Sequence, residues 1–166
     1  MAAFHNEIRI DASADEVWAV VAAAERQAEW FPGMVSSTVD GDIRTIGTAA
    51  GGFMVEQILL VDNDRRRFEY TITGPLQFEH HLGSIQVEPH GGGARVVYGQ
   101  DLRPESLTYV LRAATGDALT GLKELVENGT PSRGFTGPGG RYTLRGLPAG
   151  EHLVRVKFRT LKIAHS

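Results

Sequence analysis

The sequence contains no cysteine among its 166 residues. Disulfide bridges, thiolate metal sites and cysteine nucleophiles are therefore excluded. Hydrophobic residues make up 42% of the chain and charged residues 22%, which lies within the usual range of globular proteins. A chain of this length and composition buries enough apolar surface to form one domain without covalent cross-links.

Long apolar segments are also lacking. No apolar run approaches the roughly 20 residues that a helix needs to span a bilayer. The first residues, Met1 to Asp11, are polar and lack the apolar stretch of a signal peptide. The sequence therefore predicts a cytoplasmic protein that does not insert into a membrane.

Charge is distributed unevenly, although the net formal charge is only −3. Residues 130–166 contain seven basic side chains and one acid, a charge of +6, which leaves −9 on the first 129 residues. We expect the basic segment to lie against the acidic body. The asymmetry alone does not indicate a nucleic-acid-binding protein, and no nucleic-acid partner is predicted.

One strand and two short helices are predicted before Gly33. Residues 4–10 alternate between apolar and polar, which indicates a strand. Ser13 and Glu16 form a capping box, in which each side chain accepts a hydrogen bond from the other residue's amide. A second helical turn through residues 25–30 ends at Pro32. The first helix begins at this capping box and is about ten residues long, as indicated by apolar side chains at helical spacing: Val17, Val20, Val21 and Ala24.

From Met34 to Leu102 the apolar pattern has a period of two, which indicates strands. Turn sequences such as Asp40-Gly41 and Gly74-Pro75 separate them. Short connections between regularly spaced strands predict an antiparallel meander. The six predicted strands are residues 34–39, 43–47, 52–61, 66–73, 78–88 and 94–102.

A long helix is predicted to begin near Glu105 and to stop at Gly129. Gly116 and Gly121 interrupt it, either for close packing against the sheet or to leave room for a ligand. The order of elements predicts an α+β fold, in which a curved sheet wraps around this helix and encloses a cavity. The apolar face of the helix consists of Leu107, Leu111, Ala114, Ala118, Leu122 and Leu125.

Several motifs carry a family resemblance. The segment Ile10-Asp-Ala-Ser-Ala-Asp-Glu-Val-Trp18, followed by Trp30-Phe-Pro-Gly33, resembles the opening of the polyketide cyclase/dehydrase and lipid-transport proteins of the START/Bet v 1-like (SRPBCC) superfamily. Val55–Leu59, Arg67–Tyr70 and Gly74–Leu76 are similar as well. The resemblance covers roughly residues 4–128 and implies a helix-grip fold with a hydrophobic cavity. Members of the superfamily include lipid carriers, hormone receptors and cyclases.

The chain also departs from this family pattern. Similar sequences often carry proline, tyrosine and tryptophan where this chain has Gln77, His81 and Tyr98. Any activity that depends on those three family residues is therefore not carried over to this chain.

The adjacent residues His80 and His81 cannot chelate one metal ion together, because neighbouring strand residues point to opposite faces. Gly83 and Ile85 share the parity of His81, so we expect His81 to face the interior and His80 to face solvent. An inward histidine is either a hydrogen-bonded core residue or a proton-transfer group. No metal and no organic cofactor is predicted.

Glu56 lies in a segment that is apolar on both parities, so periodicity does not fix its direction. One alternative places its carboxyl in the apolar interior on the face of Met54, Ile58 and Leu60, where its pKa would rise. In the other alternative, Gln57 faces inward and Glu56 faces solvent. The family resemblance favours the inward orientation of Glu56.

Three functions are compatible with these residues. The first is the binding or carriage of an apolar, polyketide- or lipid-like small molecule. The second is a cyclase or dehydratase, in which His81 moves the proton, Glu56 orients it, and Tyr98 or Tyr70 stabilises an enolate oxygen. The third is an interaction module that binds a partner through its basic tail. The predicted ligand-binding residues are Trp30, Met54, Tyr70, Phe78, Gln100, Leu111 and Ala118.

The sequence divides into a ligand-binding domain, residues 1–129, and an extension, residues 130–166. In the extension, a Gly-rich linker precedes a predicted β-hairpin. Its last strand alternates the apolar Val154, Val156 and Phe158 with basic residues. A lone hairpin is marginally stable in water. We therefore expect it to pair with an exposed sheet edge, of its own body or of a second copy, and the latter arrangement would form a homodimer.

Overall fold

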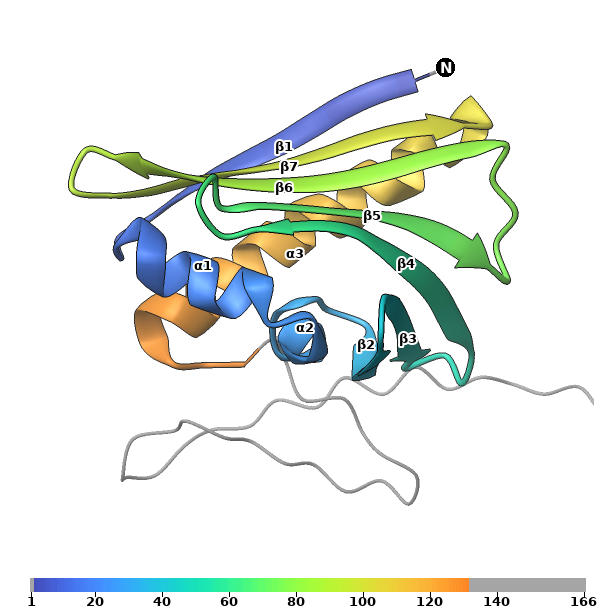
Figure 1. Ribbon diagram of the computed structural model, residues 1–166, viewed down its shortest axis with the longest axis horizontal. Helices are drawn as coiled ribbons and strands as arrows, with labels where there is room; N and C mark the ends of the chain where they lie inside the picture. The colour runs from blue at the N-terminus through green and yellow to red at the C-terminus, as the bar shows by residue number, and fades with distance from the viewer. Residues whose placement is uncertain (1, 132–166) are drawn as a thin grey trace, which may run out of the picture.

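A seven-stranded antiparallel sheet and one long helix dominate the computed structural model (Figure 1). The structure describes residues 2–131. The predicted hairpin of the extension lies outside these residues, and its pairing stays a prediction. The strands are β1 (Ala2–Ile10), β2 (Met34–Asp40), β3 (Ile43–Thr48), β4 (Phe53–Asp62), β5 (Arg67–Gly74), β6 (His80–His90) and β7 (Gly93–Arg103). The helices are α1 (Ala14–Ala22), η1 (Ala24–Arg26), α2 (Gln27–Trp30), η2 (Glu105–Leu107) and α3 (Thr108–Asn128).

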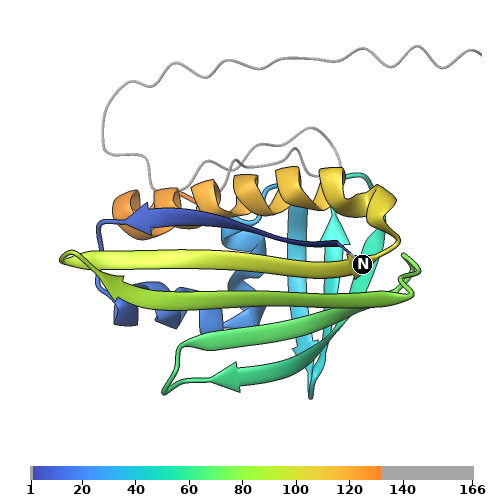
Figure 2. The ribbon, with the colours of Figure 1, turned by 90° about the horizontal axis from the view of Figure 1, so that it is seen from above.

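The strand order in the sheet is β1-β7-β6-β5-β4-β3-β2, and every neighbouring pair is antiparallel. Strands β2 to β7 therefore form the predicted meander, and β1 adds to the far side of β7. Figure 2 shows α3 running along the β1 side of the curved sheet. The helix packs mainly on β1 and β7 and against α2. The predicted α+β helix-grip arrangement is confirmed.

The predicted ends of two helices are also confirmed. The amide of Glu16 donates to Ser13 Oγ at 3.2 Å, and the amide of Ser13 donates to Glu16 Oε2 at 2.9 Å, which completes the capping box of α1. At the other end of the domain, Gly129 adopts a left-handed conformation with φ of 65°, and its amide donates to the carbonyl oxygen of Leu125 at 2.9 Å.

One detail of the predicted β4 pattern is wrong. A β-bulge between Ile58 and Leu60 adds a residue to the strand, so that Leu60 pairs with Glu69 and leaves the inward face. Leu60 is therefore exposed, whereas Met54 and Ile58 pack against the core. The open question on this strand is settled: Glu56 is buried on the inward face, and Gln57 is half-buried with its amide bonded to Asp42.

The apolar face of α3 is less uniform than predicted. Its first part is only half-buried at Leu111 and Ala114, whereas Ala118 and Leu122 are buried in the core. Gly116 packs beside β1, where an added Cβ would meet Asn6 Nδ2 at 3.6 Å, an ordinary contact distance. An added methyl group would therefore fit at Gly116, so close packing does not require a glycine there. No helix in the described part of the chain is long and apolar enough to cross a bilayer.

Candidate functional site

Four polar side chains on three adjacent strands face the interior between the sheet and α3. Tyr70 lies on β5, His81 on β6, and Tyr98 and Gln100 on β7. Residues that pair across neighbouring strands point to the same face of a sheet, and Gly83 on β6 pairs with both Tyr70 and Gln100. His81 and Tyr98 lie two residues away on β6 and β7, so their side chains point to that same face. All four are almost fully buried. The surrounding core is otherwise mostly apolar, so these residues form a buried polar cluster.

The cluster is joined by a continuous chain of hydrogen bonds. The amide of Ile72 donates to His81 Nδ1 at 3.1 Å, which places the proton of a neutral ring on Nε2. That nitrogen therefore donates to Gln100 Oε1 at 2.9 Å. The amide nitrogen of Gln100 donates to the hydroxyl of Tyr70 at 3.0 Å, and the hydroxyls of Tyr70 and Tyr98 lie 2.7 Å apart.

The two phenols contain one more donor than they can use. Each hydroxyl carries one hydrogen, but the contact between the two oxygens uses only one of them. Gln100 occupies a lone pair of Tyr70 and takes no hydrogen from it. In either orientation of the pair, one phenolic hydrogen therefore has no acceptor among the described residues. A buried donor of this kind is rare in native proteins and calls for a partner that the described residues do not supply.

Both phenols remain protonated at neutral pH. Burial, together with the nearby carboxylate of Glu56, raises the pKa of Tyr70 to about 12. Burial and the neighbouring Tyr70 raise the pKa of Tyr98 well above its ordinary value. The pair is therefore suited to donate a hydrogen bond and unsuited to act as a base.

His81 is held in its neutral form. Burial lowers its pKa to about 4, which the hydrogen bond with Gln100 only partly opposes. Both ring nitrogens are already engaged, one with a backbone amide and the other with Gln100. This geometry favours the interpretation of His81 as a hydrogen-bonded residue that orients Gln100. His80, as predicted, points the other way and is exposed, 3.6 Å from Asp101.

A buried ion pair lies beside the cluster. Arg44 on β3 and Glu56 on β4 are directly opposed in the ladder, and Arg44 Nε donates to Glu56 Oε2 at 2.8 Å. The guanidinium group also lies over the rings of Phe68 and Tyr70, at 5.1 and 5.3 Å from their centroids. Burial raises the pKa of Glu56 above its ordinary value, and the charge and hydrogen bonds of Arg44 oppose that rise.

The other predicted ligand-binding residues occupy different depths. Phe78 is half-buried, and its ring centroid lies 4.9 Å from that of His81. Met54 is half-buried against the core, and Ala118 is fully buried on α3. Leu111 is half-buried nearer the start of α3 and is not part of the core cluster. The structure therefore brings Phe78 to the polar cluster and leaves Leu111 at the margin of the interior.

Trp30 is buried on α2, and its indole nitrogen has no hydrogen-bond partner among the described residues. The side-chain oxygen of Gln27, one helical turn earlier, is likewise buried without a partner. Gln27 and Arg44 were not among the residues predicted from the sequence. Gln27 lies one turn before Trp30 on the same short helix, and Arg44 shares its parity with the apolar Ile46, so helical and strand spacing are signals that could have identified both.

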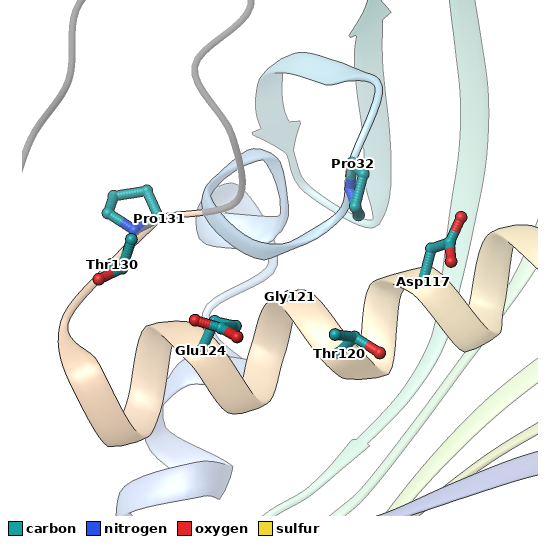
Figure 3. A pocket seen from close by; sticks show the side chains of 7 residues that line it. All are labelled: Pro32, Asp117, Thr120, Gly121, Glu124, Thr130 and Pro131. Carbon is teal, nitrogen blue, oxygen red and sulfur yellow. The ribbon is translucent and has the colours of Figure 1, made fainter. Parts of the chain in front are cut away.

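Within residues 2–131, no three His, Asp or Glu side chains gather closely enough to hold a metal ion. A separate surface cleft of about 420 Å³ lies between α3 and the loop after α2 (Figure 3). None of its residues belongs to the polar cluster. The cleft is lined by Pro32, Asp117, Thr120, Gly121, Glu124, Thr130 and Pro131.

The curved sheet that grips one long helix defines the helix-grip class of folds, which a START superfamily protein and Ara h 8.0201 share. Within that class, the chain belongs to the polyketide cyclase/dehydrase and lipid-transport family, whose model matches residues 1–128. The family predicted from the sequence is confirmed. No curated protein matches the chain.

Solved structures share the fold. The protein XoxI from Bacillus cereus is 20% identical, with a TM-score of 0.71 over 76% of this chain and 96% of that one. The di-domain ARO/CYC protein BexL of the BE-7585A biosynthetic pathway is 26% identical, with a TM-score of 0.65 over 77% of this chain and 47% of BexL. A START superfamily protein from Mycobacterium smegmatis is 14% identical, with a TM-score of 0.63 over 75% of this chain and 97% of that one.

Proposed function

We propose that the protein binds an apolar small molecule carrying a carbonyl or hydroxyl oxygen, and that the Tyr70–Tyr98 pair donates a hydrogen bond to that oxygen. The observation that carries this proposal is the phenolic hydrogen left without an acceptor inside a mostly apolar core. An unsatisfied buried donor costs about 1–3 kcal/mol, and a ligand oxygen would remove that cost.

The surroundings of the phenol pair support a ligand of this chemistry. The partly buried Met54, Ile58 and Phe78 adjoin the core and would contact apolar or ring-containing surface. The family description, polyketide cyclase/dehydrase and lipid transport, agrees with an apolar, oxygen-bearing ligand. BexL, the 26% identical relative, is itself an ARO/CYC protein of a biosynthetic pathway.

Thermal unfolding with paired ligands tests the proposal. Each pair consists of an aromatic ketone or phenol and a hydrocarbon of the same size. We expect the oxygen-bearing member to raise the melting temperature more, because only it accepts the spare hydrogen. The double variant Tyr70→Phe/Tyr98→Phe should lose this preference, about tenfold in Kd, and still bind the hydrocarbon.

Tyr109→Phe is the matched control, because that phenol is 85% exposed on α3 and far less able to bind a buried oxygen. It should leave the preference for the oxygen-bearing ligand unchanged.

The proposal is wrong if no ligand in a broad panel shifts the melting temperature, or if the double variant keeps the preference for the ketone. Mass spectrometry of small molecules that copurify with the protein would identify the ligand itself.

A second candidate function is a cyclase or dehydratase on a polyketide-like substrate, and the raised pKa of Glu56 favours it. A carboxyl with a raised pKa can accept a proton from a carbon next to a carbonyl, while the phenol pair stabilises the enolate oxygen that forms. In this mechanism His81 orients Gln100 and moves no proton. Glu56→Gln should then abolish turnover, and equal turnover by Glu56→Gln and the parent protein would rule this mechanism out.

A further inference from the structure

A large groove on the outer surface has an apolar floor. It has a volume of about 810 Å³, and Val20 of α1, Val35 of β2, and Leu125 and Val126 of α3 line it. Val35 is 53% exposed, which is high for valine beside other apolar side chains. We name this feature the α3–β2 groove. It is distinct from the buried polar cluster, because the two share no residue.

We propose that the α3–β2 groove is the docking site of the chain's own C-terminal segment, residues 154–159. This inference does not depend on the proposed ligand. The first reason is position: Pro131, the last described residue, itself lines the groove. A further 35 residues follow it, and the 22 residues between Pro131 and Val154 can reach any part of the groove, at up to about 3.5 Å per residue.

The second reason is the match of side chains. In an extended conformation, Val154, Val156 and Phe158 share one face, and the floor of the groove offers four apolar side chains. Arg155, Lys157 and Arg159 form the opposite face. Their long stems can fold over the apolar contact and place the charged ends at its rim.

The third reason is charge. Glu16 and Glu29 stand at the groove, and Glu29 is already paired with Arg26 at 2.8 Å. The cleft of Figure 3 adjoins the groove at Pro131 and adds the carboxylates of Asp117 and Glu124. Neither of these two makes an ion pair with another residue of the described part. The acidic body, at −9, and the extension, at +6, therefore meet where the described chain ends.

Docking within one chain needs little intrinsic affinity. A tether that spans the distance holds its end at an effective concentration of about a millimolar. A segment with a dissociation constant near one millimolar would therefore spend about half its time in the groove. Three apolar contacts surrounded by opposite charges are sufficient for an affinity of this size.

The absence of native cysteine makes the proposal directly testable, since two introduced thiols are then the only ones in the full-length chain. Val35→Cys is combined in turn with cysteine at residue 154, 156 or 158, so that an error of one residue in register does not hide contact. Oxidation at low protein concentration should give a monomer with an internal disulfide. The matched control replaces Val35→Cys by Leu59→Cys, which is similarly exposed at 49% but lies on β4.

We expect at least one of the Val35 pairs to form its disulfide about tenfold faster than its Leu59 counterpart. Equal rates for the two series would overturn the proposal, because they would show a tail without a preferred site. A disulfide-linked dimer as the main product would also overturn it, since the groove would then hold the tail of a second copy.

Amide hydrogen exchange of the full-length protein gives an independent measurement. Residues 154–158 should be protected in the parent protein, and Val35→Asp should remove most of that protection by placing a charge in the apolar floor. Leu59→Asp, the control at a similarly exposed site, should leave it unchanged. Fast exchange of residues 154–158 in the parent protein, or equal protection in both variants, would contradict docking in this groove.

Discussion

The ring of Tyr70 rests on a residue without a side chain. Gly83 on β6 pairs with Tyr70 across the ladder, and a Cβ atom at Gly83 would overlap the phenol ring. The position of the Tyr70 hydroxyl, and with it the hydrogen bonds to Gln100 and Tyr98, therefore depends on this glycine. A glycine under an aromatic ring is a packing requirement here, and its φ is not in the left-handed region.

Gly83→Ala should destabilise the protein by about 1–3 kcal/mol, because the ring has to move within a close-packed core. Urea denaturation measures the effect, and the ketone preference described above should weaken at the same time. Gly116→Ala is the control. Its added methyl group meets Asn6 only at 3.6 Å, and alanine favours the helix, so this variant should be up to about 1 kcal/mol more stable than the parent. Equal effects of the two substitutions would contradict this account.

The buried His81 should make stability depend on pH. Its pKa falls from 6.5 in the unfolded chain to about 4 in the folded protein. Between these values the unfolded chain binds a proton that the folded chain does not. The free energy of unfolding should therefore decrease as the pH falls from about 6.5 to about 4, by at most about 3 kcal/mol.

Denaturation curves measured across this pH range check the prediction. In His81→Asn this part of the pH dependence should disappear, whatever the variant's overall stability. His80→Asn, on the solvent side of the same strand, should retain it. An unchanged pH dependence in His81→Asn would mean that another group binds the proton.

At the residue scale, the sequence predicts directions better than partners. Strand parity correctly placed His81 inward and His80 outward, because adjacent side chains alternate. It also placed Tyr70 and Tyr98 on inward parities. It did not place Arg44 opposite Glu56, and it did not reveal that both nitrogens of His81 are engaged. Those facts depend on contacts between strands, which periodicity within one strand does not contain.

At the scale of elements, the β3–β4 hairpin shows why the contact between Arg44 and Glu56 was not predicted. The strand boundaries predicted from the sequence, 43–47 and 52–61, lie within one residue of those observed. If residues 47 and 52 are paired across that predicted loop, residue 44 falls opposite residue 55. The observed register pairs residue 47 with 53 and therefore Arg44 with Glu56. A shift of one residue in the pairing turns every side chain of a strand to the other face of the sheet. The register between β3 and β4 therefore determines whether the carboxyl of Glu56 is buried.

The two charges of this ion pair depend on each other inside the protein. Removing one partner leaves the other charge buried, so Arg44→Met alone should cost about 3–5 kcal/mol. The double variant Arg44→Met/Glu56→Leu should recover most of that loss, because two apolar side chains of similar size fill the space. Thermal or urea denaturation of the parent protein, the single variants Arg44→Met and Glu56→Leu, and the double variant completes the cycle. If the double variant is as unstable as the single one, the pair is needed for more than neutralising its own charges.

The helix α3 was predicted well in extent and less well in burial. Its stop at Gly129 is confirmed, because a capping glycine acts locally. The predicted start near Glu105 is three residues early, since Glu105–Leu107 form the 3₁₀ turn η2 and α3 begins at Thr108. The half-buried state of Leu111 and Ala114 was not predicted, since a regular apolar stripe does not show how far the sheet extends beneath it.

At the scale of the whole molecule, the order of elements was enough to predict the fold. A meander flanked by a leading strand and a long final helix has few compact arrangements. In the observed one, β1 pairs with β7 at the far end of the meander from β2. The ligand could not be predicted in the same way. It depends on which buried polar groups satisfy one another and which one is left over, and that is a property of the assembled interior.

Deletion of residues 132–166 should leave ligand binding intact. The family model ends at residue 128, and the amide of Thr130, which bonds to the carbonyl of Glu124, is retained. The ligand-induced rise in melting temperature should therefore equal that of the full-length protein within about two degrees. Loss of that rise would contradict this prediction and would mean that residues 132–166 contribute to ligand binding.

The two tryptophans give the molecule an optical signal of its own. Trp18 donates from its indole nitrogen to Asn63 at 3.0 Å, whereas Trp30 shares the core with Tyr70 and Tyr98 and has an unpartnered indole nitrogen. The Trp18→Phe protein would retain a single tryptophan, Trp30, which is located in the interior and can be excited selectively over the tyrosines. Its emission should respond when a molecule enters beside the phenols, so binding can be titrated without a label.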